Sequence, residues 1–158
     1  MNNITMLSKD AVSAKTAECF ITIEGNRYNF MQAISVEATM EKAKTEIPVL
    51  GRLAKGNKAA GVKGTGSATF HYNTSMFRKL MKRFQDTGED IYFDMQITNE
   101  DPTSAAGRQS VILKDCNFDS VIVAKFDADS DDSLTEDMDF TFESFEMPET
   151  FSVLDGMK

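Results

Sequence analysis

The stretch DIYFDMQIT, residues 90–98, alternates apolar and polar side chains, and this alternation decides the fold class. In an extended strand the two sets of side chains face opposite ways. The apolar set is Ile91, Phe93, Met95 and Ile97, and the polar set is Tyr92, Asp94, Gln96 and Thr98. Such a strand is typical of an antiparallel sheet with one buried and one solvated face, so the sequence predicts β structure here.

Outward from this stretch the same period of two recurs in both directions. The ranges expected to be mostly β are residues 17–41, 62–72 and 90–147. A hairpin turn is predicted at Gly25-Asn26, because both residues tolerate positive φ. In SVIVAKF, residues 120–126, both parities are apolar, which predicts a strand covered on both faces. The change of parity at Phe145 predicts a β-bulge.

One helix is expected, over about residues 74–87. Its apolar stripe is Met76, Phe77, Leu80, Met81 and Phe84, and its opposite face carries Arg78, Lys79, Lys82 and Arg83. Asn73 or Thr74 can cap its start, and Gly88 suits its end. The expected fold class is therefore mainly β (α+β): a β-sandwich or small barrel with one flanking helix.

The length of 158 residues favours a single domain. We expect a flexible N-terminal arm (residues 1–16), one domain (17–151) that contains a long loop (41–61), and a C-terminal tail (152–158). No apolar run reaches the roughly 20 residues that a membrane-spanning helix needs, and the N-terminus does not read as a secretory signal. We therefore expect no membrane insertion, and we expect synthesis in a cytoplasm.

Charge is distributed unevenly along the chain, whose net charge is -8. Basic residues dominate residues 41–63, whereas residues 127–149 contain many carboxylates and no basic residue. This asymmetry indicates contacts between copies of the chain or with another charged partner. The acidic total disfavours a conventional nucleic-acid grip, which needs a concentrated basic surface.

No pattern typical of catalysis is present. Cys19 and Cys116 sit among β-favouring neighbours and are interpreted as buried small hydrophobes, and the single histidine, His71, lies in a predicted strand. GVKGTGS, residues 61–67, lacks the ending of a phosphate-binding loop and is interpreted as a strand with a bulge or a close backbone approach. DADSDD, residues 127–132, begins like a calcium loop but lacks its glycine, and the bidentate Glu is missing further on. We expect no enzymatic activity, no cofactor and no metal site.

Five parts of the sequence remain as recognisable motifs: EGNRYNF (24–30), IPVLGR (47–52), KGTGSATFHY with TSMFR (63–78), the long stretch 90–129, and DMDFTFESFEMPE (137–149). Together they resemble the tail-tube proteins of Gram-positive contractile-tailed phages, defective prophages and phage-tail-like bacteriocins. The resemblance covers nearly the whole chain and rests chiefly on the long stretch.

That resemblance implies a structural protein of a virion tail or tail-like particle. Six copies would close into a ring, and rings would stack into a hollow tube that conducts DNA or ions. The implied partners are other copies, the tail sheath, the baseplate, the tape-measure protein and the tail terminator, with DNA only passing through. Assembly would take place in the bacterial host cytoplasm, and either a DNA-carrying phage or a headless bacteriocin fits. The alternative is a monomeric sandwich-fold binding or assembly module of phage morphogenesis.

Two sets of residues are candidates for assembly. The long loop has an apolar cluster and cations that could contact an acidic stretch of another copy; these residues are Ile47, Pro48, Val49, Leu50, Arg52, Lys55 and Lys58, facing Asp127, Asp129, Asp131 and Asp132. The polar side of residues 90–98 could line the channel, with Asp94, Gln96 and Thr98 as candidates. We expect this lining to be neutral to acidic, because a basic wall would hold DNA.

Overall fold

The computed structural model describes residues 5–157, which form eight antiparallel strands and one α-helix. The elements are β1 (Ala17–Ile23), β2 (Asn26–Asn29), β3 (Ala33–Ile47), β4 (Gly56–His71), α1 (Met76–Thr87), β5 (Phe93–Glu100), β6 (Arg108–Phe118), β7 (Thr135–Phe142) and β8 (Ser144–Glu149). Short 3₁₀ turns lie at Ser8–Asp10 and Asp155–Met157. The prediction of a mainly β fold with one helix is confirmed.

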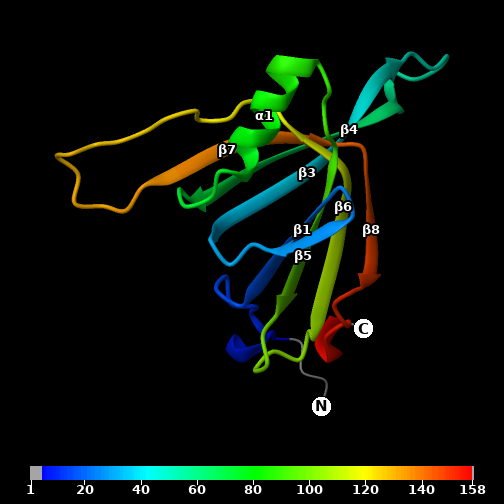
Figure 1. Ribbon diagram of the computed structural model, residues 1–158. Helices are drawn as coiled ribbons and strands as arrows, with labels where there is room; N and C mark the ends of the chain where they lie inside the picture. The colour runs from blue at the N-terminus through cyan, green and yellow to red at the C-terminus, as the bar shows by residue number, and fades with distance from the viewer. Residues whose placement is uncertain (1–4, 158) are drawn as a thin grey trace.

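Two sheets share strand β6 (Figure 1). Sheet A has the order β2-β1-β5-β6-β8, and sheet B consists of the end of β6 with β7, β4 and β3. Asp115 adopts a left-handed φ of 55° at an irregularity in the β5–β6 pairing. This β-bulge bends β6, so that its last residues, Asn117 and Phe118, pair with β7.

The core lies between the two sheets and is rich in phenylalanine. Helix α1 covers one end of it through Phe77, whose ring contacts Phe30, Phe70 and Phe118 with centroids 4.5–5.5 Å apart. Glycine in β4 makes room for this packing, since a Cβ on Gly66 would come within 2.4 Å of the Phe140 ring. A Cβ on Gly64 would lie 2.6 Å from the Phe142 carbonyl oxygen, so of the predicted bulge or close backbone approach, the close approach is observed at this glycine.

The prediction of a loop over residues 41–61 is wrong. Strands β3 and β4 stay paired from the body of the molecule as far as Ile47 and Gly56, so only residues 48–55 connect them. This part of the hairpin extends away from the core (Figure 1), and both of its faces meet solvent. It therefore lacks the alternation that reveals a half-buried strand, because neither of its faces packs against the core.

Three smaller expectations also fail. Residues 120–126 are not a strand but part of a projecting loop over residues 119–134, since β6 makes its last pair at Phe118. The parity change at Phe145 reflects the start of a new strand, because β7 ends at Phe142 in sheet B and β8 begins at Ser144 in sheet A, where Phe145 pairs with Leu113. The first turn is Glu24-Gly25, both with positive φ, one residue earlier than predicted.

The described part of the predicted N-terminal arm, residues 5–16, makes hydrogen bonds with the loop between β5 and β6. The Ser13 N–H donates to Asp101 Oδ2 at 3.0 Å, and the Ala105 N–H donates to Asp10 Oδ1 at 2.9 Å. Residues 1–4 of the predicted arm lie outside the described residues. Among residues 5–157 no helix is long and apolar enough to cross a membrane.

Candidate assembly surfaces

The basic hairpin, residues 41–63, is the first projection from the body. Its cations are Lys42, Lys44, Arg52, Lys55, Lys58 and Lys63, against the two carboxylates Glu41 and Glu46. Lys55 lies 3.9 Å from Glu46 in an exposed ion pair. At the tip, Leu50 and Leu53 are fully exposed. A charged stalk that ends in unburied leucines has the composition of a contact surface.

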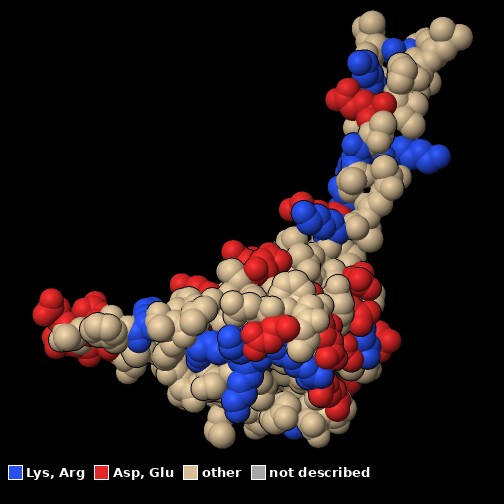
Figure 2. Space-filling view, turned by 45° about the horizontal axis from the view of Figure 1, so that its top comes forward, with Lys and Arg blue, Asp and Glu red and all other residues tan. Residues whose placement is uncertain are grey.

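The acidic arm, residues 119–134, is the second projection. Its exposed carboxylates Asp127, Asp129, Asp131 and Asp132 form the red tip at the left of Figure 2. Phe126 is 87% exposed and Val123 is 74% exposed on the same arm. Figures 1 and 2 show the arm and the basic hairpin extending in different directions from the body of the molecule.

A buried ion pair holds the root of the acidic arm. Glu136 on β7 is fully buried, and Arg78 of α1 places Nη1 2.6 Å from its Oε2. The same Nη1 donates to the Ile122 carbonyl at 3.1 Å, and Nη2 donates to the Thr74 carbonyl. The Arg78 guanidinium also lies 4.1 Å from the centre of the Tyr72 ring. One side chain therefore connects the helix, strand β7 and the start of the arm.

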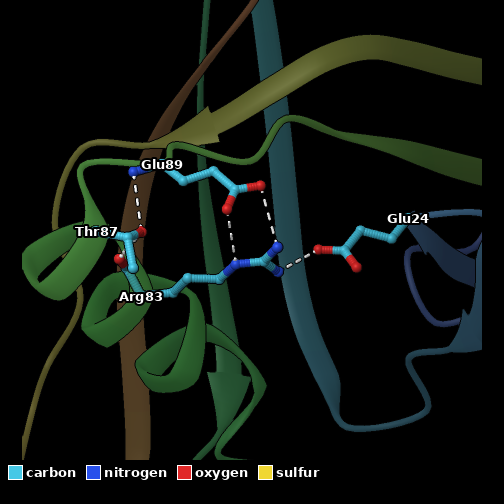
Figure 3. A network of polar contacts seen from close by, with 4 residues as sticks. All are labelled: Glu24, Arg83, Thr87 and Glu89. Atoms are coloured by element: carbon cyan, nitrogen blue, oxygen red, sulfur yellow. Dashed lines mark hydrogen bonds and ion pairs between the residues drawn. The ribbon is translucent and has the colours of Figure 1, made fainter.

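A second, exposed network joins the end of α1 to the β1–β2 turn (Figure 3). Arg83 donates to Glu24 Oε1 at 2.5 Å and to Glu89 at 3.0 and 3.3 Å. The hydrogen bond to Glu24 is the main cause that raises the pKa of Arg83. The network orients the end of the helix. Because its groups are exposed, it adds little stability.

The polar face of sheet A carries more carboxylates than cations. Strand register and alternation place these charged residues on one side: Glu18, Asp94, Glu100, Glu146 and Glu149, with Arg27, Arg108 and Lys114. Lys114 pairs with Asp94 at 3.4 Å, and Arg108 pairs with Glu149 at 3.3 Å. The surface is thus mixed with an acidic excess.

The three residues predicted to line the channel differ in how exposed they are. Asp94 and Gln96 are half-buried on this polar face, but Thr98 is only 4% exposed. Its hydroxyl lies 3.1 Å from that of Ser110 on β6, which also accepts a hydrogen bond from Gln96. Thr98 is therefore a buried polar residue of the sheet in a single copy, not a surface group.

Each set of predicted contact residues is brought together on its own projection. Ile47, Pro48, Val49, Leu50, Arg52, Lys55 and Lys58 are all exposed on the hairpin, as are the four aspartates on the arm. Sequence reasoning missed Arg78, Glu136, Leu53 and Phe126. Glu136 had a signal, because it shares its parity with the buried Met138 and Phe140.

The two thiols are free and buried. Burial raises the pKa of Cys19 to about 11 and that of Cys116 to about 12, as expected for small hydrophobic residues that stay protonated. In the part of the chain that the structure describes, His, Cys, Asp and Glu side chains do not cluster in a way that could hold a metal ion.

The fold is shared with components of contractile injection systems. A chain in the cryo-EM structure of the anti-feeding prophage baseplate superposes with a TM-score of 0.64 at 14% identity, covering 89% of this chain and 97% of its own. A chain in the extended sheath–tube complex of an extracellular contractile injection system gives 0.63 at 12%, covering 87% and 90%. At these identities the likeness shows a shared fold.

Sequence similarity gives the family. The profile of the phage tail tube protein family matches residues 4–149, so the chain belongs to that family of structural tail components. Phage-like element PBSX protein XkdM of Bacillus subtilis (strain 168) is 37% identical over 149 residues, covering 94% of this chain and 98% of the relative. The predicted resemblance is confirmed.

Proposed function

We propose that six copies of this chain close into a ring, and that rings stack into the hollow inner tube of a contractile tail or tail-like particle. Membership of the tail tube family supports the tube. The observation that carries the stacking is the pair of oppositely charged projections, each with exposed apolar side chains. In this proposal residues 17–151 form the tube domain, and the particle is a contractile-tailed phage or a headless bacteriocin.

The basic hairpin of one copy would contact the acidic arm of another copy. Each exposed ion pair contributes only about 0–1 kcal/mol, so the apolar groups Leu50, Leu53 and Phe126 would supply most of the affinity. The charges would set the register of neighbouring copies and make assembly sensitive to salt.

The polar face of sheet A would line the channel. Asp94 and Gln96 lie on it, and its carboxylates outnumber its cations. A wall with an acidic excess repels phosphate groups, so DNA could slide through without being held. The outer surface of the tube would face the sheath, and its ends would meet the baseplate, the tape-measure protein and the terminator. Rings would assemble in the host cytoplasm.

Electron microscopy of the purified chain tests the proposal. Rings and rods are expected if the chain is a tube subunit. A protein that remains a compact monomer in size-exclusion chromatography and in micrographs would instead be a sandwich-fold assembly module of phage morphogenesis.

A further inference from the structure

Sheet A ends in two free edges within the described chain. Strand β2 pairs only with β1 on one side, and β8 pairs only with β6 on the other. The first residues of β1, Ala17 and Glu18, extend past the end of β2. Free edges present unpaired backbone groups and favour pairing with another strand.

A groove of about 590 Å³ opens beside the β1 edge, and its lining combines apolar residues with Glu18, Asn29, Ser35 and Asn99. Its lining includes the buried residues Cys19 and Phe30 together with Ile97. Its exposed apolar residues are Met31 and Ile34, which are 88% and 50% exposed. Exposed apolar side chains at the mouth of a groove mark a place where another surface packs.

Strand β8 has the complementary form. All six of its residues are exposed. Phe145 pairs with the buried Leu113, which places its ring on the core side of the sheet, yet it is 45% exposed. Met147 lies at the register irregularity between Glu146 and Glu149 and is 44% exposed. Glu146 lies opposite Ile112 and points to the polar face. The core side of β8 therefore lies beyond the part of sheet A that sheet B covers.

We propose that β8 of one copy adds to the β1–β2 edge of a second copy, and that this contact closes the ring. Phe145 and Met147 would enter the groove, and Glu146 would lie beside Arg27 on the polar face. The inference rests on the proposed function and assigns its ring contact. Each copy would add its β8 to one neighbour and would accept the β8 of its other neighbour at the β1–β2 edge. This is the head-to-tail geometry that generates closed rings.

Charge complementarity supports a second copy as the occupant. Arg27 lies over the Phe20 ring at 4.2 Å and has no ion-pair partner among residues 5–157, and Glu146 likewise has no ion-pair partner there. Register places both on the polar face of sheet A, at its opposite edges. Pro148 cannot donate to a ladder, which keeps the added strand short.

Substitution of Phe145 tests the apolar half of the contact. Phe145→Ser should raise the protein concentration at which half the chains are in rings by about tenfold or more, because the exposed part of the ring is no longer buried. Phe84→Ser is the matched control, since Phe84 is 46% exposed on α1, which belongs to neither edge of sheet A. It should leave ring formation unchanged, as measured by mass photometry or light scattering on the full chain.

A mixing experiment tests the direction of the contact. Arg27→Glu alone places two carboxylates together in every contact, and Glu146→Arg alone places two guanidinium groups together, so each variant should form fewer rings than the unaltered chain. An equimolar mixture should recover rings that contain both variants in equal numbers, because alternation of the two variants places opposite charges together at every contact and removes the like-charge repulsion of the pure variants.

The outcomes separate this contact from the function that it assumes. Rings of unaltered stability from Phe145→Ser, an equal loss in Phe84→Ser, or a mixture that does not recover would overturn the β8 contact while the tube remains. An unaltered chain that forms no rings would overturn both.

Discussion

Glu136 is a charged residue at an inward position of β7, in line with the buried Met138 and Phe140. This parity already predicts from the sequence that Glu136 is buried, and a buried carboxylate requires a partner. The sequence does not identify this partner, because Arg78 is one of four similar cations on the polar face of the helix. The packing of the helix decides which of them reaches Glu136. The structure selects Arg78, which has only 16% of its side chain exposed.

Loss of Arg78 should therefore destabilise the fold. Arg78→Met leaves a buried carboxylate without its cation, and we expect the free energy of unfolding of the monomer to fall by about 3–5 kcal/mol. The double variant Arg78→Met/Glu136→Met should recover most of this loss, because apolar residues of similar size can replace a buried pair. Urea unfolding followed by circular dichroism measures both, with the exposed Lys79→Met as the control. Equal stability of Arg78→Met and Lys79→Met would contradict the assignment.

The cysteines give a second prediction at this scale. With pKa values of about 11 and 12, Cys19 and Cys116 should react with a thiolate-selective reagent such as DTNB at about pH 8 only after unfolding. The raised pKa values also mean that their contribution to stability is complete below the ordinary thiol pKa of 9.0 and is lost as the pH rises through about 11. Rapid labelling of both thiols in the folded chain would contradict their burial.

At the scale of elements, the sequence alone identifies the strands and the helix that pack on the core, and it misses the segments that project from it. Strand β5 and helix α1 were predictable because each has one apolar side that sheet or helix periodicity reveals. The outer part of the β3–β4 hairpin and the acidic arm carry no such periodicity. Their candidate contact residues were still recognisable, because blocks of like charge beside unburied apolar groups do not depend on the local backbone.

The basic hairpin should be dispensable for folding and required for stacking. Replacing residues 44–60 by Asn-Gly joins the paired residues Ala43 and Gly61 with a two-residue turn. The monomer should fold, because every residue removed lies outside the core cluster. We expect rings that no longer stack into rods, as seen by electron microscopy.

A milder variant separates the leucines from the hairpin backbone. Leu50→Ser/Leu53→Ser keeps both strands and all the cations, and should shorten the rods while leaving their salt sensitivity in place. Rods of normal length from the deletion variant would show that the hairpin is not the connector between rings.

At the scale of the whole molecule, a mainly β sandwich with one helix followed from the sequence, whereas its two projections and the two open edges of sheet A did not. The outer parts of the projections do not pack on the core, and each of these edge strands pairs on one side only in the described part of the chain, so apolar periodicity does not record them. In the proposed tube they are the surfaces that other copies complete, which explains why a single chain leaves Leu53, Phe126 and Phe145 in contact with solvent.

The rotational symmetry of particles formed by the purified, unaltered chain tests this account most directly. Electron microscopy of the protein at the highest concentration that it tolerates should show rings whose class averages have sixfold symmetry, alone or stacked in rods with a central channel. Monomeric particles throughout, or filaments without a central channel, would contradict it.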